Sequence, residues 1–397
     1  MALVCPYSLS VPGGVQGQVL GLARHLRRIG VEARIVAPGG GGNGRGLKAH
    51  DLEEMYALDS GTIDLIGRSI GIRANGSIAQ VDASPASWLD AARRIGRGGY
   101  DLLHIHEPFA PGAAYACLVL CNVPKVATFH RAGGSPLYRL LAPLARYAMS
   151  RVDRVCAVSD EAAYTACSAL GDRYLPGDHA RAITVLWNGV DIERYQRIDD
   201  GGEKSRERVV IFVGRHEERK GLGVLLEAFR MLRVRYLAGE MGQAPLELWV
   251  FGEGPQSAKL KAEYGGDPGV SWFGRVDDME LARRMKRADI FCAPSLGGES
   301  FGVVLLEAMA ASTLVVASDI AGYRTVVGEH GILVPPGDPD SLAGGLEMAF
   351  IAVAGALSPA SPQNIESARR HAAGYSMEQL AARYAEIYSE VVSNAAS

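Results

Sequence analysis

Residues 209–236 read VVIFVGRHEERKGLGVLLEAFRMLRVRY, and this stretch indicates the architecture of the second half of the chain. Residues 209–213 are all β-branched or aromatic, which is typical of a buried parallel strand. A polar loop bounded by glycines follows at 214–221, and residues 223–236 then have the composition of a helix. Strand, loop and helix in this order form the repeating unit of a parallel α/β sheet.

The same unit recurs along the whole chain. Strands are predicted at 2–5, 33–37, 102–105, 125–129 and 154–158, and again at 209–213, 246–251, 270–273, 290–293 and 314–317. Helices are predicted at 15–29, 223–236, 279–288, 302–311 and 376–392. The polar run 199–207 separates the two series. We therefore predict two tandem doubly wound α/β domains, 1–198 and 208–372, followed by a helical tail at 373–397, and we expect the ligand between the domains at the carboxyl ends of the strands.

Composition narrows the functional classes. The chain has 397 residues, enough for two domains, and its net charge of −3 provides no general attraction for nucleic acid. Its six cysteines form no C-x-x-C pair and are expected to be buried, reduced thiols. The N-terminal residues lack the pattern of a signal peptide, and no apolar run approaches the roughly 18 residues of a membrane span. These features predict a cytoplasmic protein, or one that touches a membrane only at its surface.

A glycine pair follows the first predicted strand. Gly13 and Gly14 open the first helix, where backbone N–H groups and the positive helix end favour an anion. A tight turn that binds nothing is the alternative. The turn lacks the dinucleotide fingerprint G-x-G-x-x-G, and no acidic residue ends the second strand, so a nicotinamide-dependent oxidoreductase is disfavoured.

A basic loop stands at the corresponding place in the second half. Arg215 and Lys220 suit a diphosphate, because an arginine fork grips two oxygens and a lysine adds a point charge. The alternative is a solvated loop in which these cations pair with Glu217 and Glu218.

Two carboxylates surround a third loop. Glu299 lies in the glycine-containing segment 294–302, and Glu307 follows about two turns into an apolar helix. Carboxylates accept hydrogen bonds from sugar hydroxyls, and N–H groups near Phe301 and Gly302 can donate to the same ligand. An acid among apolar helix residues is expected to have a buried task rather than a solvated one.

Histidines end two neighbouring strands. His104 and His106 share one strand face, and His130 follows the strand at 125–129. No third metal ligand is evident in the spacing, so a structural pair is favoured over a metal site. His130 is expected to face the ligand.

Taken together, these motifs resemble the retaining glycosyltransferases of family 4, which have two Rossmann-like domains (the GT-B type). Glu299 and Glu307 match the E-x7-E signature of that family, and Arg215 with Lys220 match its basic pair. The strings at 4–8, 11–16, 104–108 and 292–302 resemble the phosphatidylinositol mannosyltransferases within it. The resemblance implies a GT-B fold with a cleft between the domains and a C-terminal helix that returns to the first domain.

The resemblance also implies a donor, GDP-mannose, and no metal or cofactor. Glu307 would bind the ribose, Arg215 and Lys220 the diphosphate, and Glu299 the mannose. The implied catalytic residues are His130, Glu299, Arg215 and Lys220. The remaining donor residues implied are Gly14, Val276, Asp277, Ser300, Phe301 and Gly302. Gly14 would approach the phosphates, His130 would lie beside the transferred sugar, and Val276 and Asp277 would line the base.

The implied acceptor is phosphatidylinositol or another anionic lipid. Tyr7, Gly14 and Gln16 match headgroup positions, and Arg131 would supply a charge that a lysine provides in similar enzymes. Two segments are candidates for membrane contact, 88–97 from Trp88 to Arg97 and 137–147 from Leu137 to Tyr147. Ordinary helices that pack on a sheet are the alternative for both.

The sequence thus predicts a retaining mannosyltransferase that acts on phosphatidylinositol, peripheral at the inner face of the plasma membrane. A family 4 enzyme with another nucleotide sugar, or with a soluble or different lipid acceptor, is the nearest alternative. A sugar-nucleotide sensor that binds without turnover is the other.

Overall fold

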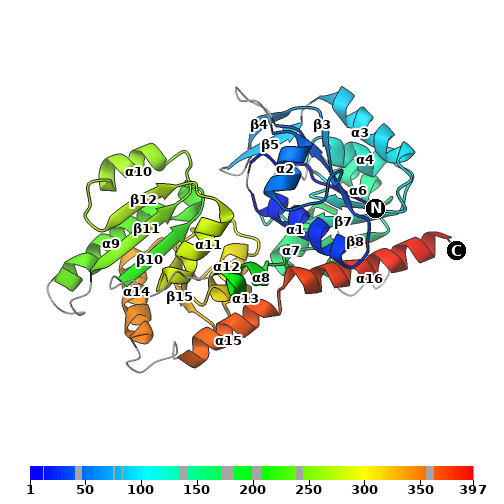
Figure 1. The fold of residues 1–397 in the computed structure, drawn as a ribbon. Coiled ribbons are helices and arrows are strands. Elements are labelled where there is room, and N and C mark those ends of the chain that lie inside the picture. The colour runs from blue at the N-terminus through cyan, green and yellow to red at the C-terminus, as the bar shows by residue number, and fades with distance from the viewer. Residues whose placement is uncertain are drawn as a thin grey trace. The chain divides into compact units, whose positions relative to one another are not determined.

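The computed structural model describes residues 1–11, 13–40, 47–74, 77–82, 84–133, 142–170, 183–198, 208–237, 245–354 and 362–396. The chain forms two compact units (Figure 1). Unit 1 comprises Met1–Gly189 and Met377–Ser397, and unit 2 comprises Val190–Ser376. The chain enters unit 2 before the expected linker 199–207, which lies outside the described residues, and its C-terminal segment rejoins unit 1 as predicted.

Unit 1 is built on a seven-stranded sheet whose strands run parallel in the order β3-β2-β1-β6-β7-β8-β9. The strands are β1 (Ala2–Val4), β2 (Arg34–Pro38), β3 (Ile63–Ile66), β6 (Leu103–His106), β7 (Lys125–Phe129), β8 (Arg154–Ala157) and β9 (Thr184–Val185). A separate antiparallel hairpin joins β4 (Ser69–Ala74) to β5 (Ser77–Asp82). Since the sheet is parallel, the carboxyl ends of its strands, including the ends that carry the histidines, lie along one edge.

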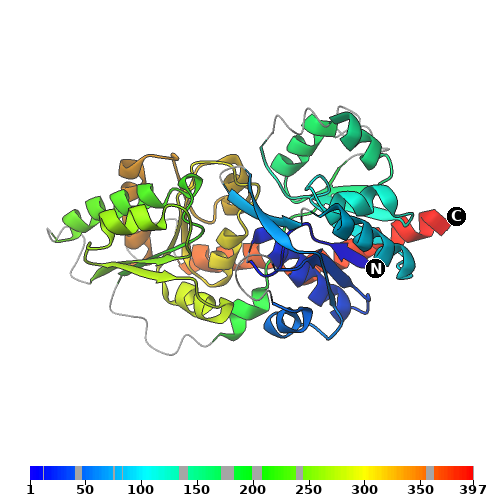
Figure 2. The ribbon, with the colours of Figure 1, turned by 90° about the horizontal axis from the view of Figure 1, so that it is seen from above.

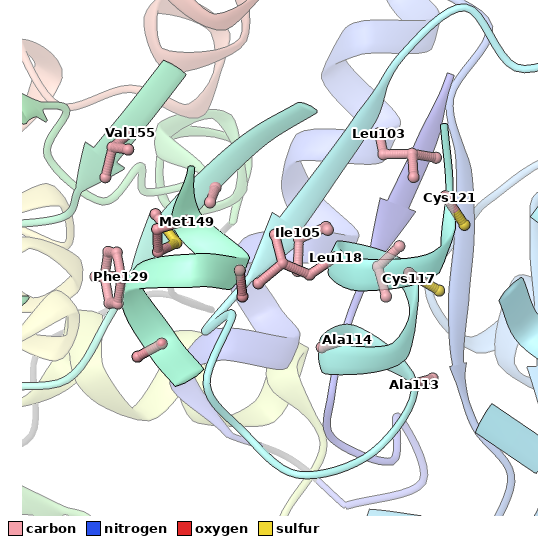
Figure 3. Close-up of a cluster of buried hydrophobic side chains, with 14 of the residues drawn as sticks. Leu103, Ile105, Ala113, Ala114, Cys117, Leu118, Cys121, Phe129, Met149 and Val155 are labelled. Atoms are coloured by element: carbon pink, nitrogen blue, oxygen red, sulfur yellow. The ribbon is translucent and has the colours of Figure 1, made fainter. Parts of the chain in front are cut away.

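Helices cover the sheet of unit 1. They are α1 (Gly14–Arg28), α2 (Ala49–Met55), α3 (Pro85–Arg97), α4 (Ala113–Leu120), α6 (Ala142–Met149), α7 (Asp160–Leu170) and α16 (Met377–Ala396). Figure 3 shows one core cluster, in which Ile105 of β6 faces Leu118 of α4. A second core cluster contains side chains from both α1 and α16, and these two helices are in contact. Leu380, Tyr384 and Tyr388 are the residues of α16 that are buried in this cluster. Burial of this apolar helix face explains why the C-terminal segment belongs to unit 1.

Unit 2 contains a six-stranded parallel sheet in the order β12-β11-β10-β13-β14-β15. The strands are β10 (Arg208–Val213), β11 (Leu246–Phe251), β12 (Val270–Gly274), β13 (Ile290–Ala293), β14 (Leu314–Ser318) and β15 (Ile332–Val334). The helices are α8 (Ile192–Arg197), α9 (Leu222–Leu237), α10 (Ser257–Tyr264), α11 (Asp278–Arg287), α12 (Val303–Ala310), α13 (Ala321–Val327), α14 (Pro339–Val353) and α15 (Pro362–Ala373), with a short 3₁₀ helix at Glu218–Lys220. Helices α9 and α14 pack together over one face of the sheet (Figures 1 and 2). Two parallel α/β units of this kind confirm the predicted fold class.

The helix starts and lengths follow from local chemistry. Asp338 begins α14, since its carboxylate accepts hydrogen bonds from the N–H groups of Asp340 at 3.1 Å and Ser341 at 3.3 Å. Within the described part of the chain, every helix is too short or too polar to traverse a bilayer.

Candidate active site

Two loops of unit 2 meet at the carboxyl ends of adjacent strands. Loop 214–221 follows β10 and loop 294–302 follows β13, and these two strands pair with each other. The N–H of Leu296 donates to the carbonyl oxygen of Arg219 at 2.7 Å. Gly221 has a φ of +68°, and a methyl group added there would lie 1.9 Å from the carbonyl oxygen of Pro294. Only glycine therefore allows this close approach of the loops.

The contact between the loops carries a network of charges. Glu299 Oε1 accepts from Lys220 Nζ at 2.8 Å and from Arg219 Nη1. Arg219 Nε lies 3.1 Å from Glu217 Oε2, and Arg215 Nη2 lies 3.0 Å from Glu217 Oε1. The side chain of Glu217 is only 1% exposed, so the centre of the network is shielded from water. The structure thus brings together the predicted residues Arg215, Lys220 and Glu299.

The network also contains Arg219 and Glu217. The sequence motifs predict no contact with a ligand for either of these two residues. The adjacent acids and bases at 215–220, which read RHEERK, are the signal that could have suggested them. The predicted alternative, a loop whose cations pair with Glu217, is correct in part, because Arg215 does so. Three cations against two carboxylates leave a net positive charge when all are ionised, which suits a diphosphate.

Glu307 lies on α12, close to α8 and α11. Burial raises the pKa of its carboxyl to about 7, Arg194 opposes this shift, and Asp278 adds to it. Arg194 Nη1 in turn pairs with Asp278 Oδ2 at 3.0 Å. The residue is partly buried, so Glu307 is not on a fully solvated helix face. A carboxyl with this pKa can accept hydrogen bonds from ligand hydroxyls near neutral pH.

The residues between the two acids form the entry to α12. Gly302 precedes the helix with a φ of +90°, and a methyl group there would lie 2.7 Å from Tyr323 Cε1. The Phe301 side chain is buried, with its ring 5.8 Å from that of Tyr375. Phe301 can therefore offer a ligand only its backbone, while Ser300 is partly exposed.

Val276 and Asp277, predicted to line the nucleotide base, lie between β12 and α11. Val276 is partly buried and Asp277 is exposed. The carboxylate of Asp277 accepts from the N–H of Glu280 at 2.8 Å and caps α11. Asp277 thus stabilises the start of α11 as its N-cap residue. Its position directly before the acidic residues of the first helical turn could have indicated this role.

Two of the predicted acceptor residues of unit 1, Gly14 and Gln16, lie in the first turn of α1. Gln16 Nε2 donates to the carbonyl oxygens of Ser8 at 3.3 Å and Val11 at 3.1 Å, so this amide holds the loop before the helix. Apart from Gly14 itself, its chain neighbours and the backbone of α1, no described atom lies within 4 Å of the point where a side chain on Gly14 would begin, so this side of the helix start is open. Tyr7 forms an isolated bridge to Val81 of β5.

Tyr7 also lies in a charged environment. Burial raises the pKa of its hydroxyl, Glu107 raises it further, and Arg131 lowers it. The predicted residues Tyr7 and Arg131 are therefore electrostatic neighbours in unit 1, with Glu107 between strand β6 and the next helix as a third member.

His130 lies directly after β7 and is held on both sides. Its backbone N–H donates to Glu107 Oε2 at 2.9 Å, and its Nε2 lies 2.9 Å from Nδ1 of His106. Burial lowers the pKa of His130 to about 3, so the ring is neutral. His130 lines a small pocket of unit 1 together with His106, Trp187 and Asn188.

His104 is a structural histidine. Its Nδ1 lies 2.7 Å from the hydroxyl of Tyr388 and its Nε2 lies 2.7 Å from Thr128 Oγ1. Thr128 also contacts the hydroxyl of Tyr384 at 3.0 Å, which ties α16 to the sheet. Both ring nitrogens are thus occupied, and the described residues contain no cluster of three side chains suited to a metal ion.

One predicted membrane segment is the helix α3. Leu89 is 44% exposed, and Arg93 and Arg97 are exposed at successive four-residue steps, so these three share one outer face. Trp88 instead turns inward, and its Nε1 donates to the carbonyl oxygen of Asp82 at 2.9 Å. In the other segment, 137–147, residues 137–141 lie outside the described residues, and Tyr147 of α6 is exposed.

Comparison with known proteins identifies the family, through matches that cover most of the chain. Residues 12–194 match the model of the family described as Glycosyltransferase Family 4, and residues 207–350 match that of Glycosyl transferases group 1. The phosphatidyl-myo-inositol mannosyltransferase of Mycolicibacterium smegmatis is 37% identical over 357 residues, which cover 87% of this chain and 83% of that protein. The chain belongs to glycosyltransferase family 4. This family 4 glycosyltransferase carries the predicted E-x7-E acids at Glu299 and Glu307, in the site described above.

Two further relatives of this family 4 glycosyltransferase bear on its fold and its acceptor. A glycosyltransferase from Rickettsia africae has a solved structure that superposes with a TM-score of 0.72 at 19% identity, covering 99% of this chain and 98% of that one. The D-inositol 3-phosphate glycosyltransferase of Jonesia denitrificans is 29% identical over 75% of this chain and 73% of that protein. The first supports the GT-B fold, and the second shows that similarity extends to an enzyme whose name specifies D-inositol 3-phosphate.

Proposed function

We propose that this glycosyltransferase moves mannose from GDP-mannose to phosphatidylinositol and retains the anomeric configuration of the sugar. The observation that carries the proposal is the network in which Lys220 and Arg219 hold Glu299 at the start of α12, two turns before Glu307. This arrangement offers cations to a diphosphate and carboxylates to sugar hydroxyls within a single unit. The relative from Mycolicibacterium smegmatis, by its name, supports the acceptor.

The donor is assigned group by group. Arg215 and Lys220 bind the diphosphate, since both are cations of the network with partly exposed side chains, as is Arg219 between them. Glu307 accepts hydrogen bonds from the ribose hydroxyls. Glu299 and the backbone at 301–302 bind the mannose, whereas Val276 and Asp277 lie beside the base. Ser300, which is partly exposed, adds a hydroxyl next to Glu299.

Glu299 binds the sugar rather than attacking it. Its Oε1 is paired with Lys220 and with Arg219, so this oxygen is already engaged and is not available for attack on the sugar. We therefore infer that the bond from the anomeric carbon to the diphosphate breaks as the acceptor oxygen bonds to the same face. The proton of the acceptor hydroxyl passes to an oxygen of the departing diphosphate. Arg215 and Lys220 stabilise the charge that grows on this leaving group, and the mechanism needs no metal or cofactor.

The acceptor is assigned to unit 1. The open side of the helix start at Gly14 and the cation Arg131 suit the phosphate of a lipid headgroup, and the hydroxyl of Tyr7 lies near Arg131. Gln16 supports this site by holding the loop before α1.

Helix α3 provides the contact with the lipid surface in this proposal. Its exposed face combines Leu89 with Arg93 and Arg97, and each arginine contributes about 1 kcal/mol at an anionic surface. Because the cytoplasmic leaflet is the anionic one, we place the enzyme at the inner face of the plasma membrane.

A second candidate is a family 4 enzyme that uses another nucleotide sugar or a soluble acceptor. The relative named D-inositol 3-phosphate glycosyltransferase favours this candidate, since its acceptor is not a lipid by name. A panel that crosses GDP-mannose and UDP-sugars with phosphatidylinositol vesicles and inositol 3-phosphate separates the two. The proposal predicts release of GDP only from GDP-mannose with vesicles. Release of UDP with the soluble acceptor would support the second candidate, and binding of donors without any release would indicate a sensor.

A further inference from the structure

The rings of His106 and His130 share one hydrogen bond in unit 1. His106 Nδ1 and His130 Nε2 are 2.9 Å apart, and both residues are buried. Burial lowers the pKa of both rings, so each is neutral and carries one proton. One of the two facing nitrogens must therefore donate and the other accept, which links the tautomers of the two rings.

The surroundings of His106 decide which nitrogen donates. His106 Nε2 is buried and has no hydrogen-bond partner among the described residues. A proton on Nε2 would leave a buried N–H group unpaired, whereas a proton on Nδ1 leaves only a lone pair unpaired. Buried N–H groups without a partner are the rarer and costlier of the two. The proton of His106 therefore belongs on Nδ1, where it is donated to His130.

We propose that His106 is a positioning residue that holds His130 as its Nδ1–H tautomer, so that His130 serves the reaction as a hydrogen-bond donor and not as a base. Nε2 of His130 accepts a hydrogen bond from Nδ1–H of His106. The proton of the neutral His130 ring is therefore on Nδ1, at the other side of the ring. This N–H group can donate to an oxygen of a nucleotide sugar but cannot accept a proton. The inference rests on the proposed function, together with the expectation from the family resemblance that His130 lies beside the transferred sugar.

Neighbouring contacts keep the pair in this arrangement. The backbone N–H of His130 is tied to Glu107 Oε2 at 2.9 Å. The ring of His104 lies 4.1 Å from that of His106 between centroids, but both of its nitrogens are bonded elsewhere, so His106 cannot exchange its partner for His104. Gln18, which lines the same pocket, is engaged with the backbone of Gly189 through both ends of its amide. His130 is thus the partner that remains for His106 Nδ1.

Two substitutions of His106 distinguish the effect of its hydrogen bond to His130 from the effect of the size of its side chain. In His106→Asn the side-chain amide nitrogen takes the approximate place of Nδ1 and can still donate to His130. In His106→Leu the donor is lost while the side chain remains large. His104→Gln is the matched control, because it disturbs a buried histidine of the same strand that does not contact His130 Nε2.

The first readout is the tautomer of His130 in the free protein, from two-bond ¹H–¹⁵N spectra of histidine-labelled samples. The wild type, His106→Asn and His104→Gln are expected to show Nδ1–H at His130, and His106→Leu is expected to show a mixture with Nε2–H. An Nε2–H signal in the wild type, or an unchanged tautomer in His106→Leu, would overturn the inference.

The second readout is mannosyl transfer to phosphatidylinositol vesicles. We expect kcat to fall about a hundredfold in His106→Leu, with KM for the donor little changed, and to recover in His106→Asn. Equal losses in His106→Leu and His106→Asn would mean that packing, not donation, matters, and would also overturn the inference. Because the spectra need no substrate, correct tautomers without any transfer would count against the proposed function alone.

Discussion

Replacement of Glu299 by alanine is expected to remove most of the transfer activity without weakening the binding of GDP. The Glu299 carboxylate is 12% exposed and is assigned to the hydroxyls of mannose, which GDP lacks. A hydrogen bond to a charged group contributes about 1.5–3 kcal/mol, and loss of one such contact in the transition state lowers kcat/KM about 10- to 150-fold. Lys220 and Arg219, which pair with Glu299, would become available to the diphosphate, so the Kd for GDP is not expected to rise.

Two measurements on the same protein samples test this prediction. Calorimetric titration with GDP gives the Kd, and initial rates of sugar transfer give kcat/KM. Glu218→Ala is the matched control, since it removes the same charge from an exposed residue of the neighbouring loop and should leave both quantities unchanged. A loss of GDP affinity in Glu299→Ala as large as the loss of rate would refute the assignment of Glu299 to the sugar.

Three further predictions concern the same site. Burial raises the pKa of Glu307 from 4.5 to about 7, so the stability that its proton contributes is complete below about pH 4.5 and is lost as the pH rises to about 7. Glu307→Gln should therefore raise the free energy of unfolding by up to about 3 kcal/mol at pH 8.5 and leave it nearly unchanged at pH 4, as measured by thermal unfolding. Lys220→Ala should raise the Kd for GDP about 10- to 150-fold in titrations, while the exposed Lys259→Ala should not. Gly221→Ala should lower the melting temperature and GDP affinity together because it forces the loops apart, whereas Gly223→Ala, in helix α9 with its nearest neighbour at 3.7 Å, should stabilise by about 0.5–1 kcal/mol. Equal melting temperatures of the two glycine variants would contradict this account of the loop contact.

The strands and helices were largely predictable because their signals are local. Lys125–Phe129 and Leu246–Phe251 match the predicted strands residue for residue, since apolar runs between breakers determine them directly. The hairpin of β4 and β5 and the short strands β3 and β15 were missed, because short runs with mixed polarity resemble loops in the sequence.

The sequence allowed individual site residues to be predicted, but not the contacts between them. Arg215, Lys220 and Glu299 were recognised from their motifs, but their contact depends on β10 and β13 being neighbours, and strand order is a property of the whole sheet. The role of Arg219 as the link to Glu299 is visible only in three dimensions. The pairing of His104 with Tyr388 joins residues far apart in the chain, so no local pattern announces it.

The most direct test of the central claim is transfer of labelled mannose from GDP-mannose into phosphatidylinositol vesicles, followed by solvent extraction. The account predicts label in the lipid phase for the wild type, a strongly reduced amount for Glu299→Ala, and normal transfer for Glu218→Ala. Label that stays in the aqueous phase while GDP accumulates would contradict the assignment of the acceptor. Transfer from a UDP-sugar in place of GDP-mannose would contradict the assignment of the donor.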